Sequence, residues 1–395
     1  MNGIKKTLVG LVLLLGLLVL FIQLSVGEQP GAKAEGVRLE RMKASEQWTG
    51  SAFSNRLETT KGSLLTMLDE WLLQESADRY PRLDARDYPR PSDHLKEGPK
   101  HPKRVTWFGH SSFLIELEGE RILIDPIWSE RASPFSWAGP QRFHPPTIEL
   151  DALSEIDAIV ISHDHYDHLD MESVKELAPR ALTWLCPLGV GAHLEAWGVH
   201  KEQIIEMDWW DEHALGELRV IATPSRHFSG RSPLFNDRNA TLWAGWAFVG
   251  KGHRVFYSGD TAMHPEFKTI GERLGPFDLT IMEAGAYNQQ WADVHLGPEQ
   301  ALLAHKLVRG KVMMPVHWAT FQLALHNWTE PAERVLAAAK HLGVSVVIPR
   351  PGEGIIIGSP PKAPQPWWPK VPWRSLEEAP AWSSGVEVLQ RPLRP

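Results

Sequence analysis

Three histidines and three aspartates are crowded into residues 163–170, which read HDHYDHLD. They follow residues 157–162, a short, largely apolar run typical of a buried strand, so the cluster is expected at a strand end. Imidazole nitrogen and carboxylate oxygen are ligands of divalent metals such as Zn²⁺, and a bound cation offsets the cost of crowding and burying these groups. We therefore interpret the cluster as a metal site, in preference to a solvated loop with incidental histidines.

Further candidate ligands follow other strand-like runs. His227, Asp260 and His317 each come after an apolar or β-rich run, where a strand is expected to end and a loop to begin. Asp125 closes the run 122–124 in the same way. Taken alone, each is weak evidence, because a histidine after a strand is usually packed or exposed and a Gly-Asp pair is usually a turn. The interpretation of these residues as metal ligands rests on their order along the chain.

That order, His-x-His-x-Asp-His followed by His, Asp and His at strand ends, resembles the metallo-β-lactamase superfamily. The resemblance implies an α/β fold of the αββα type, in which two mixed sheets pack between outer helices. It implies that Asp125 orients ligands through hydrogen bonds, and that Asp164 is not a ligand, so that its replacement with alanine retains most activity. The ligands that it implies for two zinc ions are His163, His165 and His227 for one, Asp167, His168 and His317 for the other, and Asp260 as the bridge.

A closer likeness is spread over much of the chain, from about residue 50 to 356. It resembles the N-acyl-phosphatidylethanolamine-hydrolysing phospholipase D family in segments 106–110, 125–146, 207–212, 242–246, 273–279 and 285–291. The resemblance implies a phospholipid substrate, cleaved to an N-acylethanolamine and a phosphatidic acid. His295 is similar to a family histidine beside the substrate, although the sequence fits an ordinary histidine of a surface loop about equally well. Asp167, Asp260 and His295 are thus the expected catalytic residues.

Two metal ions can bridge a water and lower its pKa, so the expected nucleophile is a bridging hydroxide that attacks phosphorus. Two alternatives stay open at this point. One is a hydrolase of the same fold acting on a lactone, a cyclic phosphodiester or a nucleic acid, and the other is a membrane-tethered scaffold that keeps zinc for stability alone. Among the 18 tryptophans, Trp209, Trp210, Trp243 and Trp246 could line an acyl groove, although core packing is their ordinary role.

Composition supports a globular enzyme, because 43% of the 395 residues are hydrophobic and 23% are charged. The net charge of −7 argues against a nucleic-acid partner bound by the usual basic surface. The single cysteine, Cys186, has no partner for an internal disulfide and is expected to be a buried thiol.

The N-terminal residues 1–27 carry two lysines followed by an almost wholly apolar run to Val26. At ~1.5 Å per residue this run approaches the ~30 Å thickness of a bilayer, so a retained transmembrane anchor is favoured over a cleaved signal segment. The lysines at 5 and 6 place the N-terminus in the cytoplasm and the catalytic domain on the periplasmic or extracellular side.

The rest of the chain divides into three parts. Residues 28–103 are read as a flexible linker and an N-terminal extension, with an amphipathic helix over 63–73 that docks on the main domain. Residues 104–358 form the hydrolase domain, with helices expected at 171–179, 298–308 and 330–342. Residues 359–395 are a Pro/Trp-rich tail whose composition opposes regular structure. A strap across the domain and an interfacial membrane contact are both open for this tail.

Overall fold

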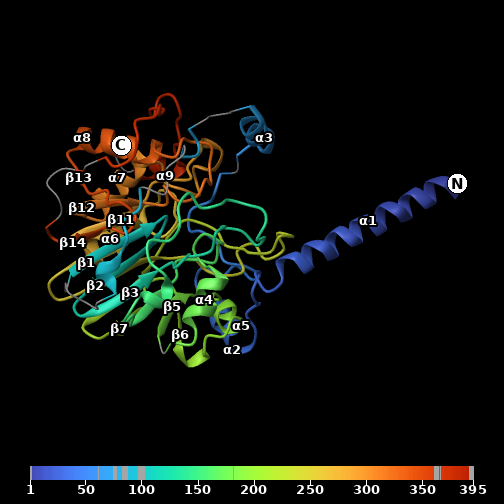
Figure 1. The fold of residues 1–395 in the computed structure, drawn as a ribbon, viewed down its shortest axis with the longest axis horizontal. Helices are drawn as coiled ribbons and strands as arrows, with labels where there is room; N and C mark the ends of the chain where they lie inside the picture. The colour runs from blue at the N-terminus through green and yellow to red at the C-terminus, as the bar shows by residue number, and fades with distance from the viewer. Residues whose placement is uncertain are drawn as a thin grey trace.

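The computed structural model describes residues 2–60, 62–73, 78–81, 88–96, 103–180, 182–359, 364 and 366–390. Two seven-stranded sheets face each other at its centre (Figure 1). The first sheet contains, in spatial order, β14 (Gly354–Ile356), β1 (Lys103–Gly109), β2 (Ser112–Leu117), β3 (Glu120–Ile124), β4 (Ala158–Val160), β5 (Thr183–Pro187) and β6 (Ile204–Met207). The second contains β13 (Ser345–Val346), β12 (Val312–Val316), β11 (Leu279–Glu283), β10 (Arg254–Tyr257), β9 (Gly245–Val249), β8 (Leu218–Thr223) and β7 (Glu212–Leu215).

Helices cover the outer faces of both sheets. Along β3, Leu123 packs with the apolar residues of the outer helices, whereas Ile122 and Ile124 face the other sheet, as strand alternation requires. The helices over the first sheet are α4 (Met171–Leu177) and α5 (Gly191–Ala196), and those over the second are α6 (Glu266–Leu274), α7 (Pro298–Leu307) and α8 (Glu330–Leu342). This αββα sandwich is the fold that the sequence predicts, and α4, α7 and α8 lie where the apolar spacing places them.

Strand direction brings the functional loops together. In the first sheet β3 to β6 are parallel, and in the second β10 to β13 are parallel. β8 also runs in the direction of β10, since each is antiparallel to β9 between them. The carboxyl ends of β3, β4, β8, β10, β11 and β12 therefore supply loops to one rim of the sandwich.

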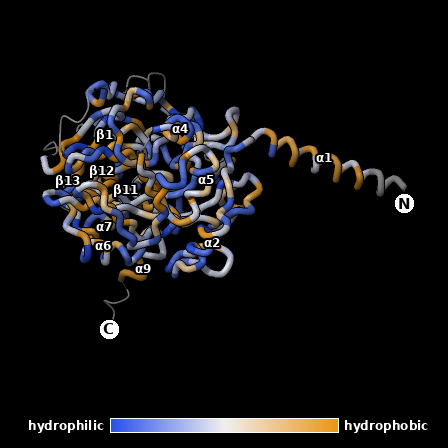
Figure 2. The backbone as a smooth tube through the Cα atoms, turned by 90° about the horizontal axis from the view of Figure 1, so that it is seen from below, coloured by the Kyte–Doolittle hydropathy of each residue, from blue (hydrophilic) through white to orange (hydrophobic). Residues whose placement is uncertain are grey.

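The N-terminal helix α1 (Asn2–Val26) projects from the body of the protein (Figure 1), and most of it from Thr7 onward is apolar (Figure 2). Among the described residues, Thr7–Val26 is the one helical segment long and apolar enough to cross a membrane, a test that a signal sequence also passes. The expected flexible linker is not free. Residues 28–34 lie on the domain, where the Trp197 indole donates to Glu28 O at 2.9 Å and His193 Nδ1 accepts from Ala32 N at 3.1 Å.

The N-terminal extension contains α2 (Gly36–Lys43) and α3 (Leu64–Leu73). α3 is the helix expected over 63–73, and it docks through Glu70, whose carboxylate accepts from the Asn288 side chain at 2.9 Å. Its apolar stripe is not wholly buried as core, because Leu65 and Leu72 are exposed. The reason is that only one side of this short helix meets the domain, where Met67 lines a cavity.

The C-terminal tail crosses the domain surface. Trp367 and Trp368 are buried and lie 5.5 Å and 5.3 Å, between ring centroids, from the buried Trp318. Trp373 and Trp382 stay partly exposed. The tail is less irregular than its composition suggests, because α9 (Ser384–Gln390) forms in the proline-free stretch between Pro380 and Pro392. Residues 360–363, 365 and 391–395 of this segment lie outside the described residues.

Candidate metal centre

The seven expected ligands lie together on the rim formed by the strand ends. Residues 163–168 occupy the loop after β4, and the other three ligands follow β8, β10 and β12. The ligating atoms fall into groups within which every pair lies within 4.8 Å. Each of these groups contains expected ligands: His163 with His165 and His227, His163 with His168 and Asp260, Asp167 with His168, His317 and His110, and Asp260 with His317, Glu283 and His295.

One side of the centre is made of imidazoles. His165 Nδ1 lies 2.9 Å from His163 Nε2 and 3.2 Å from His227 Nε2. The far nitrogen of His227 donates to Val294 O at 2.9 Å, which fixes its ring so that Nε2 faces the other two histidines. Burial lowers the pKa of all three histidines. Three neutral rings with converging nitrogens suit a zinc ion.

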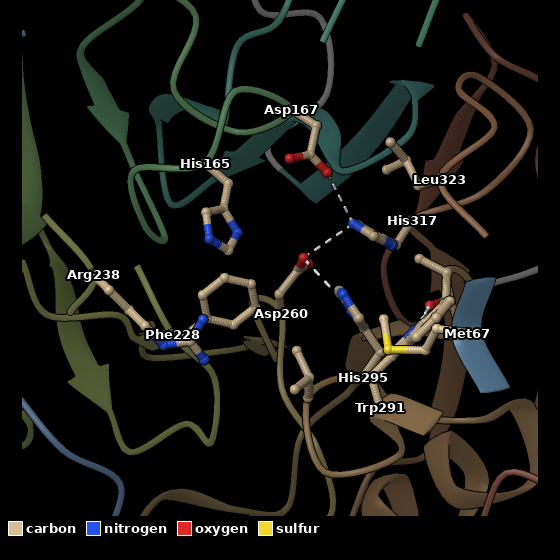
Figure 3. A pocket seen from close by; sticks show the side chains of 12 residues that line it. Met67, His165, Asp167, Phe228, Arg238, Asp260, Trp291, His295, His317 and Leu323 are labelled. Carbon is tan, nitrogen blue, oxygen red and sulfur yellow. Dashed lines mark hydrogen bonds and ion pairs between the residues drawn. The ribbon is translucent and has the colours of Figure 1, made fainter. Parts of the chain in front are cut away.

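The other side of the centre carries the carboxylates. Asp260 Oδ2 lies 3.0 Å from His317 Nε2 and 3.2 Å from His168 Nε2. The same oxygen lies 3.9 Å from Nε2 of both His163 and His227, so Asp260 stands between the two sides. Asp167 Oδ2 approaches His317 Nε2 at 3.2 Å from the outer edge (Figure 3).

The electrostatics of this cluster favour added positive charge. Burial opposes charge on His168 and His317, but Asp260 and the other carboxylates outweigh it, raising the pKa of His317 to about 10 and that of His168 well above its usual value. Within the described residues, buried Asp260 Oδ1 has no hydrogen-bond partner, and His168 Nε2 makes an ion-pair contact with Asp260 Oδ2 but no hydrogen bond. A cation site needs ligating nitrogen and oxygen atoms that are not already used in hydrogen bonds and that lie beside anionic carboxylates. These residues therefore fit divalent metal ions.

Asp125 holds the ligands from behind. It follows β3, and its Oδ2 accepts from His168 Nδ1 at 2.9 Å and from the Tyr257 hydroxyl of the facing sheet at 2.7 Å. Its Oδ1 accepts from Ser162 N at 2.7 Å, directly before the metal-binding loop. The backbone φ of Asp125 is +39° and that of His317 is +67°, a left-handed conformation that non-glycine residues adopt at a cost. The hydrogen bonds of Asp125 explain how the fold maintains its strained backbone.

Two residues near the ligands escaped the sequence analysis as site residues. His110, directly after β1, places Nε2 2.9 Å from Asp167 Oδ2, and burial followed by the charge of His317 lowers its pKa to about 3. Glu283, the last residue of β11, is fully buried and hydrogen-bonded to Thr261 N at 2.6 Å and to His295 Nδ1. His110 follows the end of β1 in the same way as the expected ligands follow their strands, so the sequence could have indicated it. A single glutamate at the end of an apolar run does not indicate a site residue.

His295 is part of the centre and not a surface histidine. It precedes α7, and its side chain is 15% exposed, at the wall of the cavity above the ligands. Its Nδ1 lies 3.8 Å from Asp260 Oδ2 (Figure 3) and is hydrogen-bonded to Glu283. Burial lowers the pKa of His295 to about 4, while burial and the charge of Asp260 raise the pKa of Glu283 well above its usual value.

The cavity above the ligands has a volume of about 420 Å³. Figure 3 shows Asp167, Asp260, His295 and His317 on one side and Phe228 with Arg238 opposite. The Arg238 guanidinium stacks 4.7 Å from the Phe228 ring centroid and supplies a cation at the mouth. The remaining lining residues include Met67, Trp291, Val294 and Leu323, which make the wall largely apolar.

The tryptophans considered for an acyl groove lie elsewhere. Trp243 and Trp246 are fully buried in the core between the sheets, and Trp209 is 6% exposed with its indole donating to Trp243 O at 2.7 Å. Trp210 is only partly buried, with its ring stacked under Arg273 at 3.8 Å. None of the four lines the described cavity above the ligands; Trp209, Trp243 and Trp246 are core residues, and Trp210 packs against the edge of that core.

Asp164 differs from its neighbours because its side chain points away from the ligands. It accepts from Gly230 N at 2.9 Å and from the Thr241 hydroxyl at 2.8 Å, and it is 1% exposed. The expectation that Asp164→Ala retains most activity stays a prediction, and the buried contacts add an expected effect on stability. We predict that this substitution lowers the free energy of unfolding by about 2–4 kcal/mol, since two buried donors lose their acceptor. Urea denaturation tests this, with exposed Asp151→Ala as the control, and equal midpoints for the two variants would contradict it.

Comparisons with known proteins agree with this geometry. The Beta-lactamase superfamily domain matches residues 120–318. An uncharacterized protein of Mycobacterium tuberculosis is 47% identical over 303 residues, which cover 76% of this chain and 79% of that protein. N-acyl-phosphatidylethanolamine-hydrolyzing phospholipase D 1 of Caenorhabditis elegans is 37% identical over 245 residues, covering 58% of this chain and 68% of that protein.

A solved structure shows the same fold. Isothiocyanate hydrolase from Delia radicum gut bacteria superposes with a TM-score of 0.54 at 19% identity, over 65% of this chain and all of that one. At this identity the likeness concerns the fold alone. The matched domain, the relatives and the His/Asp centre lead to one conclusion: the chain belongs to the β-lactamase superfamily and is a metal-dependent hydrolase of the metallo-β-lactamase fold.

Proposed function

We propose that this hydrolase is a phosphodiesterase of the phospholipase D type, which cleaves N-acyl-phosphatidylethanolamine to an N-acylethanolamine and a phosphatidic acid. The observation that carries the proposal is the cavity itself, because an anionic, metal-compatible floor, a cation at the mouth and apolar walls match a phosphodiester with acyl chains. The name of the Caenorhabditis elegans relative supports the substrate class.

The centre is proposed to hold two zinc ions. When bound, they would lower the pKa of a water and offset negative charge that grows on the phosphoryl oxygens. The residues proposed to hold them are His163, His165 and His227 on one side, Asp167, His168 and His317 on the other, and Asp260 between the sides.

The residues around the floor bind and orient the substrate. Arg238, stacked on Phe228, is placed to pair with a phosphate oxygen at the cavity mouth. The apolar wall, which includes Trp291 and Leu323, excludes water and contacts acyl chains. His295 has its Nδ1 engaged by Glu283, so Nε2 is the ring nitrogen available to the substrate.

The Glu283–His295 pair is suited to deliver a proton to the leaving alkoxide. While the pair carries no net charge, the proton between Nδ1 and the carboxylate sits on one group or the other. If Glu283 holds the proton, it donates to Nδ1, and the one hydrogen of the neutral His295 ring is on Nε2. If His295 holds the proton, both ring nitrogens carry a hydrogen. An N–H at this position can donate to the oxygen that departs from phosphorus.

The substrate proposal has a direct test. We expect kcat/KM to be about 100-fold higher for a long-chain N-acyl-phosphatidylethanolamine than for a soluble aryl phosphodiester, since each buried CH₂ adds ~0.8 kcal/mol of binding that can be used in the transition state. Lipid extracts after turnover should contain phosphatidic acid and N-acylethanolamine, identified by mass spectrometry. Equal efficiency on both substrates, or turnover of lactones with no phospholipid cleavage, would remove the phospholipase proposal.

We also propose that α1 is a retained anchor with the catalytic domain on the periplasmic or extracellular side. The apolar segment and the lysines before it support this orientation. Protease added to spheroplasts is expected to degrade the domain, while a cytoplasmic marker protein stays intact. A domain that survives until the membrane is lysed would place it on the other side.

A further inference from the structure

The segment that leaves α1 is tied to one loop of the catalytic domain. Arg231 donates from Nε and Nη2 to Gln29 O at 3.1 Å and 3.0 Å, three residues after α1 ends. The same guanidinium donates to Asp164 O and Leu169 O of the metal-binding loop at 2.6 Å and 2.8 Å, and it is 1% exposed. Gln29 is therefore fixed beside the proposed metal-binding loop, and it lies only three residues after the end of α1. A membrane that holds α1 is thus close to the loop that begins at Arg231.

That loop presents apolar side chains to solvent. Leu234 is 43% exposed and Phe235 is 87% exposed. Phe235 has φ +55°, which is costly for a bulky residue. The conformation is held from within, because Asp237 Oδ2 accepts from Arg231 N at 2.8 Å and from Ser232 N at 2.7 Å. These hydrogen bonds keep an aromatic ring exposed on the surface, although contact of an apolar ring with water is unfavourable.

A second loop faces the first. Trp137 is 62% exposed, and its ring lies 5.3 Å from that of Phe135. Phe135 and Phe235 line the same groove, which has a volume of about 620 Å³. The groove shares His165 and Asp167 with the cavity above the ligands, so it leads from the two exposed tips to the metal centre.

We propose that Trp137, Leu234 and Phe235 form a membrane-entry tip, which inserts into the surface of the same bilayer that α1 crosses. Three observations favour a lipid surface as the occupant. The segment that follows α1 is hydrogen-bonded to Arg231 at the start of the loop, the tip is aromatic and aliphatic as interfacial segments are, and Phe235 of the tip also lines the groove. A bilayer lipid could then reach the centre without passing through water. The proposal rests on insertion of α1 and not on which lipid is cleaved.

The tip can be probed in the full-length chain, because the native Cys186 is fully buried and leaves introduced cysteines as the reactive thiols. Cysteine variants at Trp137, Leu234 and Phe235 are labelled with an environment-sensitive fluorophore and reconstituted in nanodiscs of phosphatidylcholine and phosphatidylglycerol. Lipids brominated near the headgroup end of the acyl chain are expected to quench these labels by about twofold or more, since interfacial side chains reach ~5–10 Å into the boundary. The matched control is a label at exposed Lys340 on α8, on the side of the domain away from α1 (Figure 1).

The outcomes separate the possibilities. Quenching at the three tip positions and none at Lys340 supports the proposal, whatever substrate the enzyme cleaves. Tip labels that respond to brominated lipid no more than the Lys340 label overturn it. Shielding of the tip that depends on protein concentration and not on brominated lipid would assign the surface to a second copy of the chain, and would also overturn it. Circular dichroism of each variant verifies that the exposed substitutions leave the fold intact.

Discussion

Replacing Asp260 with alanine is expected to reduce kcat by about 10⁴-fold and to lower the metal content of the purified protein from the proposed two ions per chain to one or fewer. The reason is its position. Asp260 Oδ2 lies within 3.9 Å of a nitrogen from both the imidazole side and the carboxylate side, and its Oδ1 is a buried atom without a partner. Its removal leaves each side with an incomplete set of donors and takes away the negative charge that holds two cations at short distance.

Elemental analysis and steady-state kinetics on the same preparations test this prediction. The control is Asp151→Ala, an exposed aspartate that should keep both ions and full activity. A wild-type stoichiometry near one that added zinc does not raise would refute the two-metal proposal. So would an Asp260→Ala protein that retains two ions and more than a few per cent of the activity.

Most of this centre could be predicted from the sequence because the proposed ligands are chemically distinctive and lie at strand ends. His163, His165 and His168 are close in sequence, so their grouping needs only a local turn. His317 follows β12, which is parallel to β11, and His227 follows β8, which runs in the same direction as β10 because both are antiparallel to β9. The carboxyl ends of these strands therefore meet at one rim. Polar residues that follow apolar runs can be recognised in the sequence, and in the fold the same residues lie at the ends of strands.

Other features depend on contacts that no local pattern encodes. Glu283 joins the site because β11 pairs with β10 and β12 and thereby places its last residue under Asp260 and His295. Asp164 lies between two proposed ligands in the sequence, but its side chain points away from the centre. Its carboxylate oxygens accept hydrogen bonds from Gly230 N and the Thr241 hydroxyl, which belong to a loop far away in the sequence. Residues 28–34 look flexible by composition, yet they dock through backbone groups that any sequence possesses.

The His295 side chain is expected to contribute about 10³-fold to kcat on N-acyl-phosphatidylethanolamine and much less on an aryl phosphodiester, within the 10²–10⁴ range typical of acid–base catalysis. An alkoxide is a poor leaving group and needs the proton that Nε2–H can donate, whereas a nitrophenolate leaves without it. His295→Ala should therefore show its defect mainly on the lipid, and kcat rather than KM should carry the loss.

Glu283 supplies the control for this assignment, because it touches His295 without reaching the substrate cavity. We expect Glu283→Ala to reduce kcat on the lipid by about 10–100-fold, as for other residues that orient an active group through a hydrogen bond. Glu283→Gln, which keeps a polar partner for Nδ1, should lose less. In the His295→Ala background, Glu283→Ala should cost little more, since its effect runs through the imidazole. Equal losses on lipid and aryl substrates, or fully additive losses in the double variant, would show that the pair stabilises the fold and does not deliver a proton.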